Sequence, residues 1–128
     1  HWLLSAAFRM NQAMNRERDN TMKQVIQKAK EYIMDNYQDP DLSVEKICRQ
    51  LHMSPAYFST MFKKETGQPF VTYLTDYRMD RAEEMVLNTD EKSYKIAEKV
   101  GYQDANYFSY VFKKKFGVSP SKYRASGK

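Results

Sequence analysis

Apolar residues recur three or four positions apart along most of this 128-residue chain, which is the spacing of one face of an α-helix. No stretch alternates apolar and polar residues for long, and no Asn-Gly or Asp-Gly hairpin turn is present. The first clear apolar stripe ends near Asn36 and consists of Met22, Val25, Ile26, Ala29, Tyr32 and Ile33. The pattern predicts an all-α protein.

Capping signals divide the rest of the chain into further helices. Serine, aspartate and proline favour helix starts, and glycine favours helix ends. Leu42 and Ile47 are also spaced as a hydrophobic staple around Ser43. After the helix that ends near Asn36, these signals predict six more: one capped by Ser43, Pro55 to about Thr66, about Phe70 to Asn88, one capped by Ser93 reaching about Val100, one capped by Asp104 ending at Gly117, and a short one from Pro120 through Tyr123.

The first 20 residues allow two interpretations. Leu3, Ala7, Met10 and Met14 lie at heptad spacing, which favours an amphipathic helix. Such a helix would be a linker or a dimerising element entering from an upstream domain, whereas the alternative is a frayed tail. The chain starts without Met, so we expect it to be a piece of a longer protein.

Charge is distributed unevenly along the chain, whose formal net charge is +5. Residues 1–92 carry 13 Lys/Arg and 14 Asp/Glu, whereas residues 93–128 carry 8 and 2. A basic C-terminal third is typical of a protein with a polyanionic partner. A solubilising, solvated face is the alternative reading of the same charges.

The sequence offers little material for catalysis or metal binding. Cys48 is the single cysteine, which excludes a disulfide within the chain and suits a reducing cytosol. His1 and His52 have no partners at metal-ligand spacing, and no nucleophile and base are paired. No apolar run approaches the roughly 18 residues of a membrane span. We therefore predict a cytoplasmic protein that is not an enzyme, with no catalytic residues, metal or cofactor.

The most specific feature is an internal repeat at an offset of 50 residues. The matching pairs are Tyr57-Phe58-Ser59 with Tyr107-Phe108-Ser109, Phe62-Lys63-Lys64 with Phe112-Lys113-Lys114, Gly67 with Gly117, and Tyr73 with Tyr123. Upstream the offset becomes 49, so that Ile47 matches Ile96. One extra residue is therefore expected in the second unit, within Gly101–Asp104.

Each repeat unit reads as helix, short turn, helix, which is the pattern of a helix-turn-helix motif. A duplicated helical hairpin without a nucleic-acid role is the alternative, although such arrays usually need three or more repeats. The connecting helix from Phe70 to Asn88 has 19 residues and would span about 28 Å. That length approaches the ~34 Å between successive major grooves. The two second helices could therefore reach neighbouring grooves on one face of DNA.

These residues resemble a known family. The run from Ser93 to Arg124, SYKIAEKVGYQDANYFSYVFKKKFGVSPSKYR, resembles the signature of AraC/XylS-type transcription regulators. The first unit, from Met53 to Gly67, is similar to its less stereotyped partner, and the helix with Tyr77-Arg78-Met79 and Ala82 is similar to the family's linker helix. The resemblance covers roughly residues 21–125 and extends to the C-terminal domain of YesN-type two-component response regulators. It implies a receiver or sensor domain upstream of this chain.

The resemblance implies a homeodomain-like, all-α fold of about seven helices, with two recognition helices and an asymmetric DNA site. The corresponding domains are residues 1–20, a linker or N-terminal helix; 21–68, the first helix-turn-helix subdomain; 69–90, the linker helix; 91–125, the second subdomain; and 126–128, a tail.

By position, the resemblance gives each unit three base-facing residues. These are Ala56, Ser59 and Thr60 in the first unit, and Asn106, Tyr107 and Tyr110 in the second. The first three can offer only weak hydrogen bonds or contact with a thymine methyl, so we expect that unit to rely on phosphate contacts and DNA shape. Packing against a neighbouring helix is the alternative role of the two tyrosines. His52 stands where the second unit has Gly101, so the first turn is expected to differ, because positive φ costs histidine more.

Basic residues near the helix ends are candidate phosphate contacts. They are Lys63, Lys64, Lys113 and Lys114, with Arg124, Lys115 and Lys122 as weaker candidates. Arg78, on the linker helix, is expected to have a structural role instead. It would pair with Asp76 or Glu84, or dock onto a helix-turn-helix unit.

Together these features predict sequence-specific binding to double-stranded DNA by the output domain of a bacterial transcription regulator. The two recognition helices would enter successive major grooves, and an activator would also contact RNA polymerase. No membrane partner is expected. The alternative function is a helical protein-interaction module whose basic end meets an acidic partner.

Overall fold

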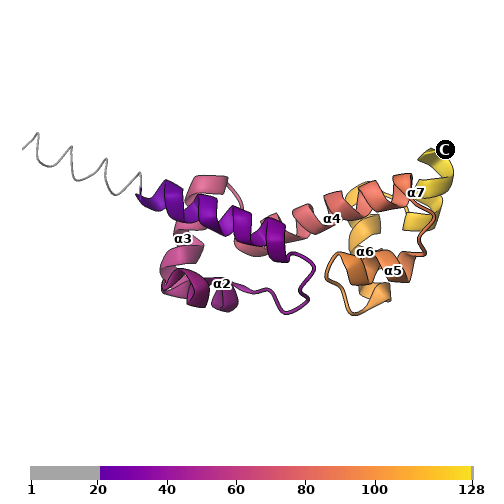
Figure 1. Ribbon diagram of the computed structural model, residues 1–128. Helices are drawn as coiled ribbons and strands as arrows, with labels where there is room; N and C mark the ends of the chain where they lie inside the picture. Colours follow the sequence, from indigo (N-terminus) through magenta and orange to yellow (C-terminus); the bar gives the residue numbers. More distant parts are fainter. Residues whose placement is uncertain (1–20, 128) are drawn as a thin grey trace, which may run out of the picture.

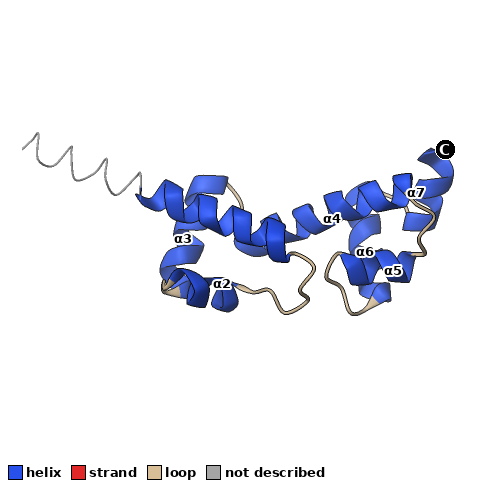
Figure 2. Ribbon diagram, in the orientation of Figure 1, coloured by secondary structure: helices blue, strands red, loops and turns tan. Residues whose placement is uncertain are grey.

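The structure, a computed structural model, describes residues 21–127. These residues form seven helices and no strand, so the all-α prediction is confirmed (Figure 2). The interpretations of residues 1–20 lie outside the described residues. Residues 21–36 form a first helix. The others are α2 Val44–Leu51, α3 Pro55–Thr66, α4 Phe70–Asn88, α5 Ser93–Lys99, α6 Ala105–Phe116 and α7 Pro120–Gly127.

Two helical units lie side by side along α4 (Figure 1). The first contains the helix over residues 21–36, α2, α3 and the start of α4, and its core is Ile26, Ala29, Ile33, Leu42, Ile47, Cys48, Phe58, Phe62, Phe70 and Leu74. The second contains the rest of α4 with α5, α6 and α7, and its core is Met79, Ala82, Val86, Ile96, Ala97, Val100, Phe108 and Phe112. Each unit therefore has an apolar core of its own, and α4 takes part in both.

The α4 helix serves the two units in different ways. Its first turns occupy in the first unit the position that α7 occupies in the second. Tyr73 meets the Phe62 ring edge-on at 5.2 Å, and Tyr123 of α7 meets the Phe112 ring in the same way at 5.5 Å. Its later turns match the first helix. The core residues of both follow the same spacing of three and then four positions: Ile26, Ala29 and Ile33, then Met79, Ala82 and Val86. The α4 helix is thus the last helix of the first unit and the first helix of the second.

Local hydrogen bonds explain where α2, α3 and α6 begin. The Ser43 hydroxyl accepts from the Lys46 backbone N–H at 3.1 Å, and the Ser54 hydroxyl accepts from the Tyr57 N–H at 3.2 Å. The Asp104 carboxylate accepts from the N–H groups at the start of α6, the first at 2.9 Å. These three caps, and α4 from Phe70 to Asn88, confirm the sequence-based predictions.

Two predicted helix boundaries are wrong. Lys92, rather than Ser93, is the N-cap of α5, and no side chain caps this end. The reason is the offset of 49 upstream of the second turn, which aligns Ser43 with Lys92. The seventh helix also continues beyond Tyr123 to Gly127. Beyond Tyr123 the helix contacts α4, since Arg124 Nε donates to the Val86 carbonyl at 2.8 Å.

The two serines provide a matched test of helix capping. Ser43→Ala removes a capping oxygen and should lower the free energy of unfolding by about 0.5–2 kcal/mol. Ser93→Ala lies inside the first turn of α5 and should change it by no more than about 0.5 kcal/mol. Chemical denaturation followed by circular dichroism measures both. Equal losses in the two variants would contradict the assignment of Lys92 as the cap.

Candidate nucleic-acid interface

Each unit contains a helix-turn-helix motif, made of α2 and α3 in the first unit and of α5 and α6 in the second. His52 follows α2 in the left-handed region with φ 56°, and Gly101 occupies the equivalent position with φ 97°. The expected difference at this residue is therefore absent, and His52 is the one non-glycine with positive φ in residues 21–127. The second turn is longer by one residue, as predicted, because three residues separate Val100 from Asp104 and two separate Leu51 from Ser54.

The second helix of each motif buries one face and exposes the other. Phe58 and Phe62 of α3, and Phe108 and Phe112 of α6, have no exposed surface. The structure places all six predicted base-facing residues on the surface: Ala56, Ser59, Thr60, Asn106, Tyr107 and Tyr110. The side chains expected to meet bases are therefore accessible in both units.

The two tyrosines of α6 dominate the exposed face of the second unit. Tyr107 is 56% exposed and Tyr110 is 63% exposed. Their rings lie 6.4 Å apart in a stacked arrangement, and Tyr107 also contacts the ring of Tyr102 at 6.0 Å. Packing thus orients these rings without removing them from solvent. They present two exposed rings with hydroxyl groups on the same helix as the exposed Asn106.

The exposed faces of α3 and α6 open toward the same part of α4. One shallow groove is lined by Ser59, Thr60 and Lys63 of α3 together with Val71, at the start of α4. A second groove is lined by Tyr107, Tyr110 and Lys114 of α6 and again by Val71, which is 66% exposed. The two candidate reading faces therefore lie on the same side of the molecule as the start of α4.

The linker helix adds residues to this surface that sequence reasoning missed. Val71, Thr72 and Thr75 of α4 line the groove beside Tyr107 and Tyr110. Their signal in the sequence was weak, because β-branched residues on a predicted helix are most simply assigned to its core. No sequence signal could have identified them, because the exposure of Val71 depends on how the two units pack around α4.

The lysines fall into two groups. Lys63, Lys64, Lys113 and Lys114 are exposed in the last turns of α3 and α6, and within residues 21–127 no hydrogen bond or ion pair engages their ammonium groups. Lys115 is engaged, since its Nζ lies 2.8 Å from the Asp80 carboxylate and 3.7 Å from that of Asp76. The exposed lysines thus carry uncompensated positive charge beside the reading faces.

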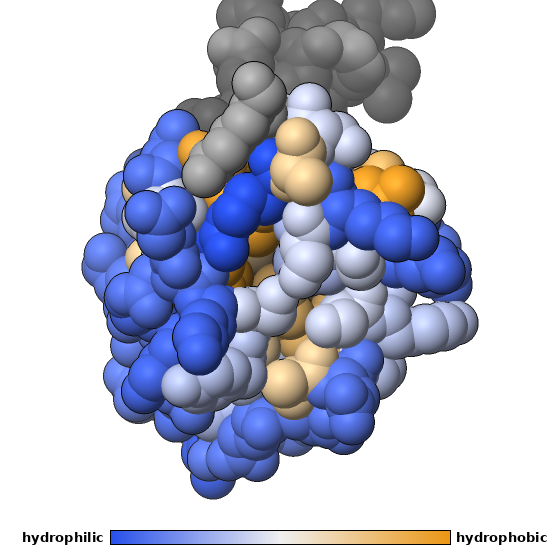
Figure 3. Space-filling view, turned by 90° about the vertical axis from the view of Figure 1, so that its right-hand side faces the viewer, coloured by the Kyte–Doolittle hydropathy of each residue, from blue (hydrophilic) through white to orange (hydrophobic). Residues whose placement is uncertain are grey.

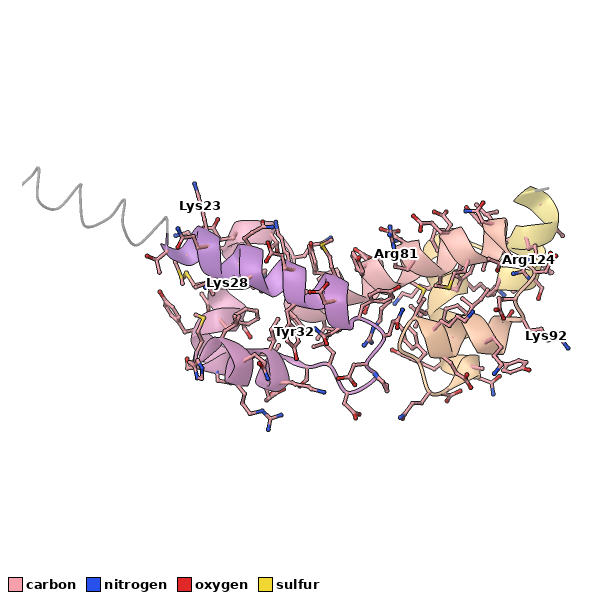
Figure 4. The ribbon with its side chains drawn as sticks, in the orientation of Figure 1. Lys23, Lys28, Tyr32, Arg81, Lys92 and Arg124 are labelled. Atoms are coloured by element: carbon pink, nitrogen blue, oxygen red, sulfur yellow. The ribbon has the colours of Figure 1, made fainter. Side chains whose placement is uncertain are left out.

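Arg124 lies apart from these lysines. Its Nε donates to the Val86 carbonyl at 2.8 Å, and Figure 4 shows Arg124 on α7, beside the C-terminal end of α4. This end of the molecule is covered mostly by hydrophilic residues, with hydrophobic ones confined to a narrow hollow and the edge (Figure 3). The contact with α4 gives Arg124 a packing role, which makes it a weaker phosphate candidate than the lysines.

Arg78 does not form the predicted pair with Asp76 or Glu84. It is buried and donates to two backbone carbonyls of the first unit, those of Tyr37 and Asp39. The alternative expectation, docking onto a helix-turn-helix unit, describes its position. The predicted carboxylate pairing fails because the side chain turns inward from α4, toward the loop after the first helix.

The described residues contain no group of three or more His, Cys, Asp or Glu that could hold a metal ion. Burial raises the pKa of the Cys48 thiol above its ordinary value, which keeps the thiol protonated at neutral pH. In residues 21–127 no helix is both long and apolar enough to cross a membrane.

Comparisons with known proteins agree with this geometry. Residues 47–126 match the family model described as a helix-turn-helix domain. The chain is 39% identical over 103 residues to the transcriptional regulatory protein YesN of Bacillus subtilis, covering 78% of this chain and 28% of YesN. Across the first eight curated relatives, the chain spans between 11% and 38% of their length.

Solved structures show the same fold. The C-terminal domain of AraT, a response regulator from Geobacillus stearothermophilus, is 41% identical and superposes with a TM-score of 0.78, covering 80% of this chain and 84% of that domain. The DNA-binding domain of AdpA, solved with a target DNA, is 21% identical with a TM-score of 0.75, covering 79% and 90%. The chain belongs to the AraC/XylS-type family of helix-turn-helix DNA-binding domains.

Proposed function

We propose that this chain binds double-stranded DNA sequence-specifically by placing α3 and α6 in successive major grooves on one face of the duplex. The observation that carries this proposal is that the exposed faces of both helices open toward the start of α4, since Val71 borders both grooves. The 19 residues of α4 span about 28 Å, close to the ~34 Å between neighbouring grooves. The AdpA complex supports the proposal, because a domain of the same fold binds DNA.

The two units would contribute unequally to base recognition. In α6, the Asn106 amide can form a bidentate pair with adenine, and Tyr107 and Tyr110 add hydroxyl groups and apolar surface. In α3, Ala56, Ser59 and Thr60 offer little, and the Thr60 hydroxyl already donates to the Ala56 carbonyl at 3.1 Å. The second unit would therefore specify its half-site strongly, and the first would depend more on phosphates and DNA shape.

The four exposed lysines at the ends of α3 and α6 would bind phosphates on either side of each groove. Lys63 borders the groove that contains Ser59 and Thr60, and Lys114 borders the groove that contains Tyr107 and Tyr110. Phosphate contacts fix the register of a recognition helix without reading sequence.

The likeness to YesN and to the AraT domain supports a role as the output domain of a response regulator, with a receiver domain upstream. If the complete protein is an activator, RNA polymerase would be a further partner. Selection of duplexes from a random pool tests DNA binding directly and would return both the motif and the spacing of the half-sites. Failure to bind any duplex at low salt would reject the proposal in favour of a protein-interaction module.

Lys114→Ala tests the phosphate contacts. Loss of one contact should weaken binding to every duplex about equally and reduce the slope of log affinity against log salt by about 0.9. Lys28→Ala removes the same charge from the first helix, where Figure 4 labels it, and Lys28 lines neither groove, so the slope should stay unchanged. Fluorescence anisotropy over a salt series measures both slopes. Equal slopes for Lys114→Ala and the native chain would contradict the assignment.

Asn106→Ala and Ser59→Ala test the unequal reading faces. Loss of the amide should relax the preference at one or two base pairs of the second half-site, by about 1–3 kcal/mol. Ser59→Ala should leave the selected motif almost unchanged. Repeating the selection with each variant provides the comparison. An unaltered motif for Asn106→Ala would show that this face of α6 does not read bases.

A further inference from the structure

The two units touch at a joint beneath the middle of α4. The loop after the first helix and the turn between α5 and α6 approach each other there (Figure 1). Pro40 of the loop and Gly101, Tyr102 and Gln103 of the turn line the same small hollow. Tyr37, at the start of the loop, packs against the cores of both units. The joint is therefore an interface between the two motifs, separate from their reading faces.

Arg78 lies at the centre of this joint. It is 8% exposed, and it is the one buried charged side chain among residues 21–127. Its Nε donates to the Tyr37 carbonyl at 2.9 Å, and its Nη2 donates to the Asp39 carbonyl at 2.8 Å. On the other side its guanidinium lies 5.4 Å from the centre of the Tyr102 ring. One side chain of the linker thus contacts a loop of the first unit and the turn of the second.

The second unit leaves room for this contact at Gly101. A Cβ at this position would lie 2.5 Å from the Tyr37 carbonyl oxygen and 2.9 Å from Arg78 Nε. These distances are too short for any side chain, so a glycine is required here for space as well as for its φ of 97°. The backbone of the second turn therefore packs directly on the hydrogen bonds that Arg78 makes with the first unit.

The arrangement resists separation because the charge is buried. No carboxylate is bonded to Arg78 in the described residues, and the Asp39 carboxylate is bonded to Lys46 instead. The two carbonyls and the Tyr102 ring are thus what replaces water around the guanidinium. Rotating one unit relative to the other would break these contacts together, and each one that water did not replace would leave a polar group unsatisfied.

The turn of α4 between the two cores contains the side chain that contacts both units. Leu74 is the last buried α4 residue in the first core, and Met79 is the first in the second core. Between them, Tyr77 packs against the first core and meets the Tyr37 ring at 5.2 Å. Arg78 is the buried side chain of this turn, and it contacts the first unit through the Tyr37 and Asp39 carbonyls and the second through the Tyr102 ring.

We propose that Arg78 locks the two helix-turn-helix units in one relative orientation and thereby makes the spacing between the two half-sites a determinant of DNA specificity. The proposal rests on the proposed function, because it requires both units to bind one duplex. Adding one base pair moves a half-site by about 3.4 Å along the duplex and by about a tenth of a turn around it. A locked pair of units cannot follow this displacement with both recognition helices.

The first arm of the test needs no DNA. Spin labels are attached at Lys28→Cys and Ser121→Cys, one on each unit, in a Cys48→Ala background, and the distance between them is measured by double electron–electron resonance. The native joint should give one narrow distribution, and Arg78→Met should broaden it. Arg81→Met is the matched control, because Arg81 contacts Glu84 and the Tyr77 ring on its own helix. This control should keep the narrow distribution.

The second arm measures binding to the selected duplex and to duplexes with one base pair inserted or deleted between the half-sites. The native chain and Arg81→Met should lose about tenfold or more in affinity for the altered spacings. Arg78→Met should bind the three duplexes within about threefold of one another. A narrow distance distribution in Arg78→Met, or native discrimination between spacings, would overturn the proposal.

Two further outcomes are distinguishable. If the native chain binds no duplex, the proposed function fails, while the distance measurement still reports whether Arg78 locks the units. If circular dichroism shows that Arg78→Met does not fold, Arg78→Lys takes its place. Lysine keeps the charge, but its single ammonium lacks the planar fork that reaches two carbonyls at once. Arg78→Lys should therefore broaden the distribution too, and a native distribution in this variant would reject the lock.

Discussion

One constraint shapes the rest of this structure: a single helix must bury apolar side chains in two separate cores. Phe70 and Leu74 of α4 belong to the first core, and Met79, Ala82 and Val86 belong to the second. Units of roughly 50 residues are marginally stable alone, because they bury a small fraction of their surface. By sharing α4, each unit gains apolar side chains for its core beyond those of its other helices. The same sharing fixes the distance between the two exposed recognition helices.

Local chemistry made most of this fold predictable from the sequence. The Ser54-Pro55 pair, Gly67 and Gly117 act within one or two turns, and their helices begin and end as expected. The prediction of Ser93 as a cap was wrong. A serine before an apolar stripe is a common cap, but the repeat offset of 49 places Lys92 at the position that Ser43 holds in the first unit. The extension of α7 includes Arg124, which donates to the Val86 carbonyl, a contact between residues 38 positions apart that no local signal reports.

In the candidate site, too, some residues could be predicted from local sequence patterns and others depend on contacts between the units. The exposed faces of α3 and α6 follow from helical periodicity, so their outward residues could be named from sequence. Arg78 and Val71 could not be assigned, because their roles depend on how two units pack rather than on any local pattern. A buried arginine on a linker looks like a surface ion-pair residue until its acceptors, the carbonyls of Tyr37 and Asp39, are seen.

The lock at Arg78 gives the weaker reading face a function that its side chains alone do not explain. If α3 enters a major groove as proposed, Ala56, Ser59 and Thr60 would provide little direct readout, and a freely tethered first unit would add phosphate affinity without selectivity. A unit held in one orientation is presented at a high effective concentration to one position on the duplex and to no other. Its phosphate contacts and its fit to DNA shape then depend on register. Specificity at the first half-site would therefore arise from the orientation of the two units, which Arg78 of the linker fixes, more than from bases contacted by α3.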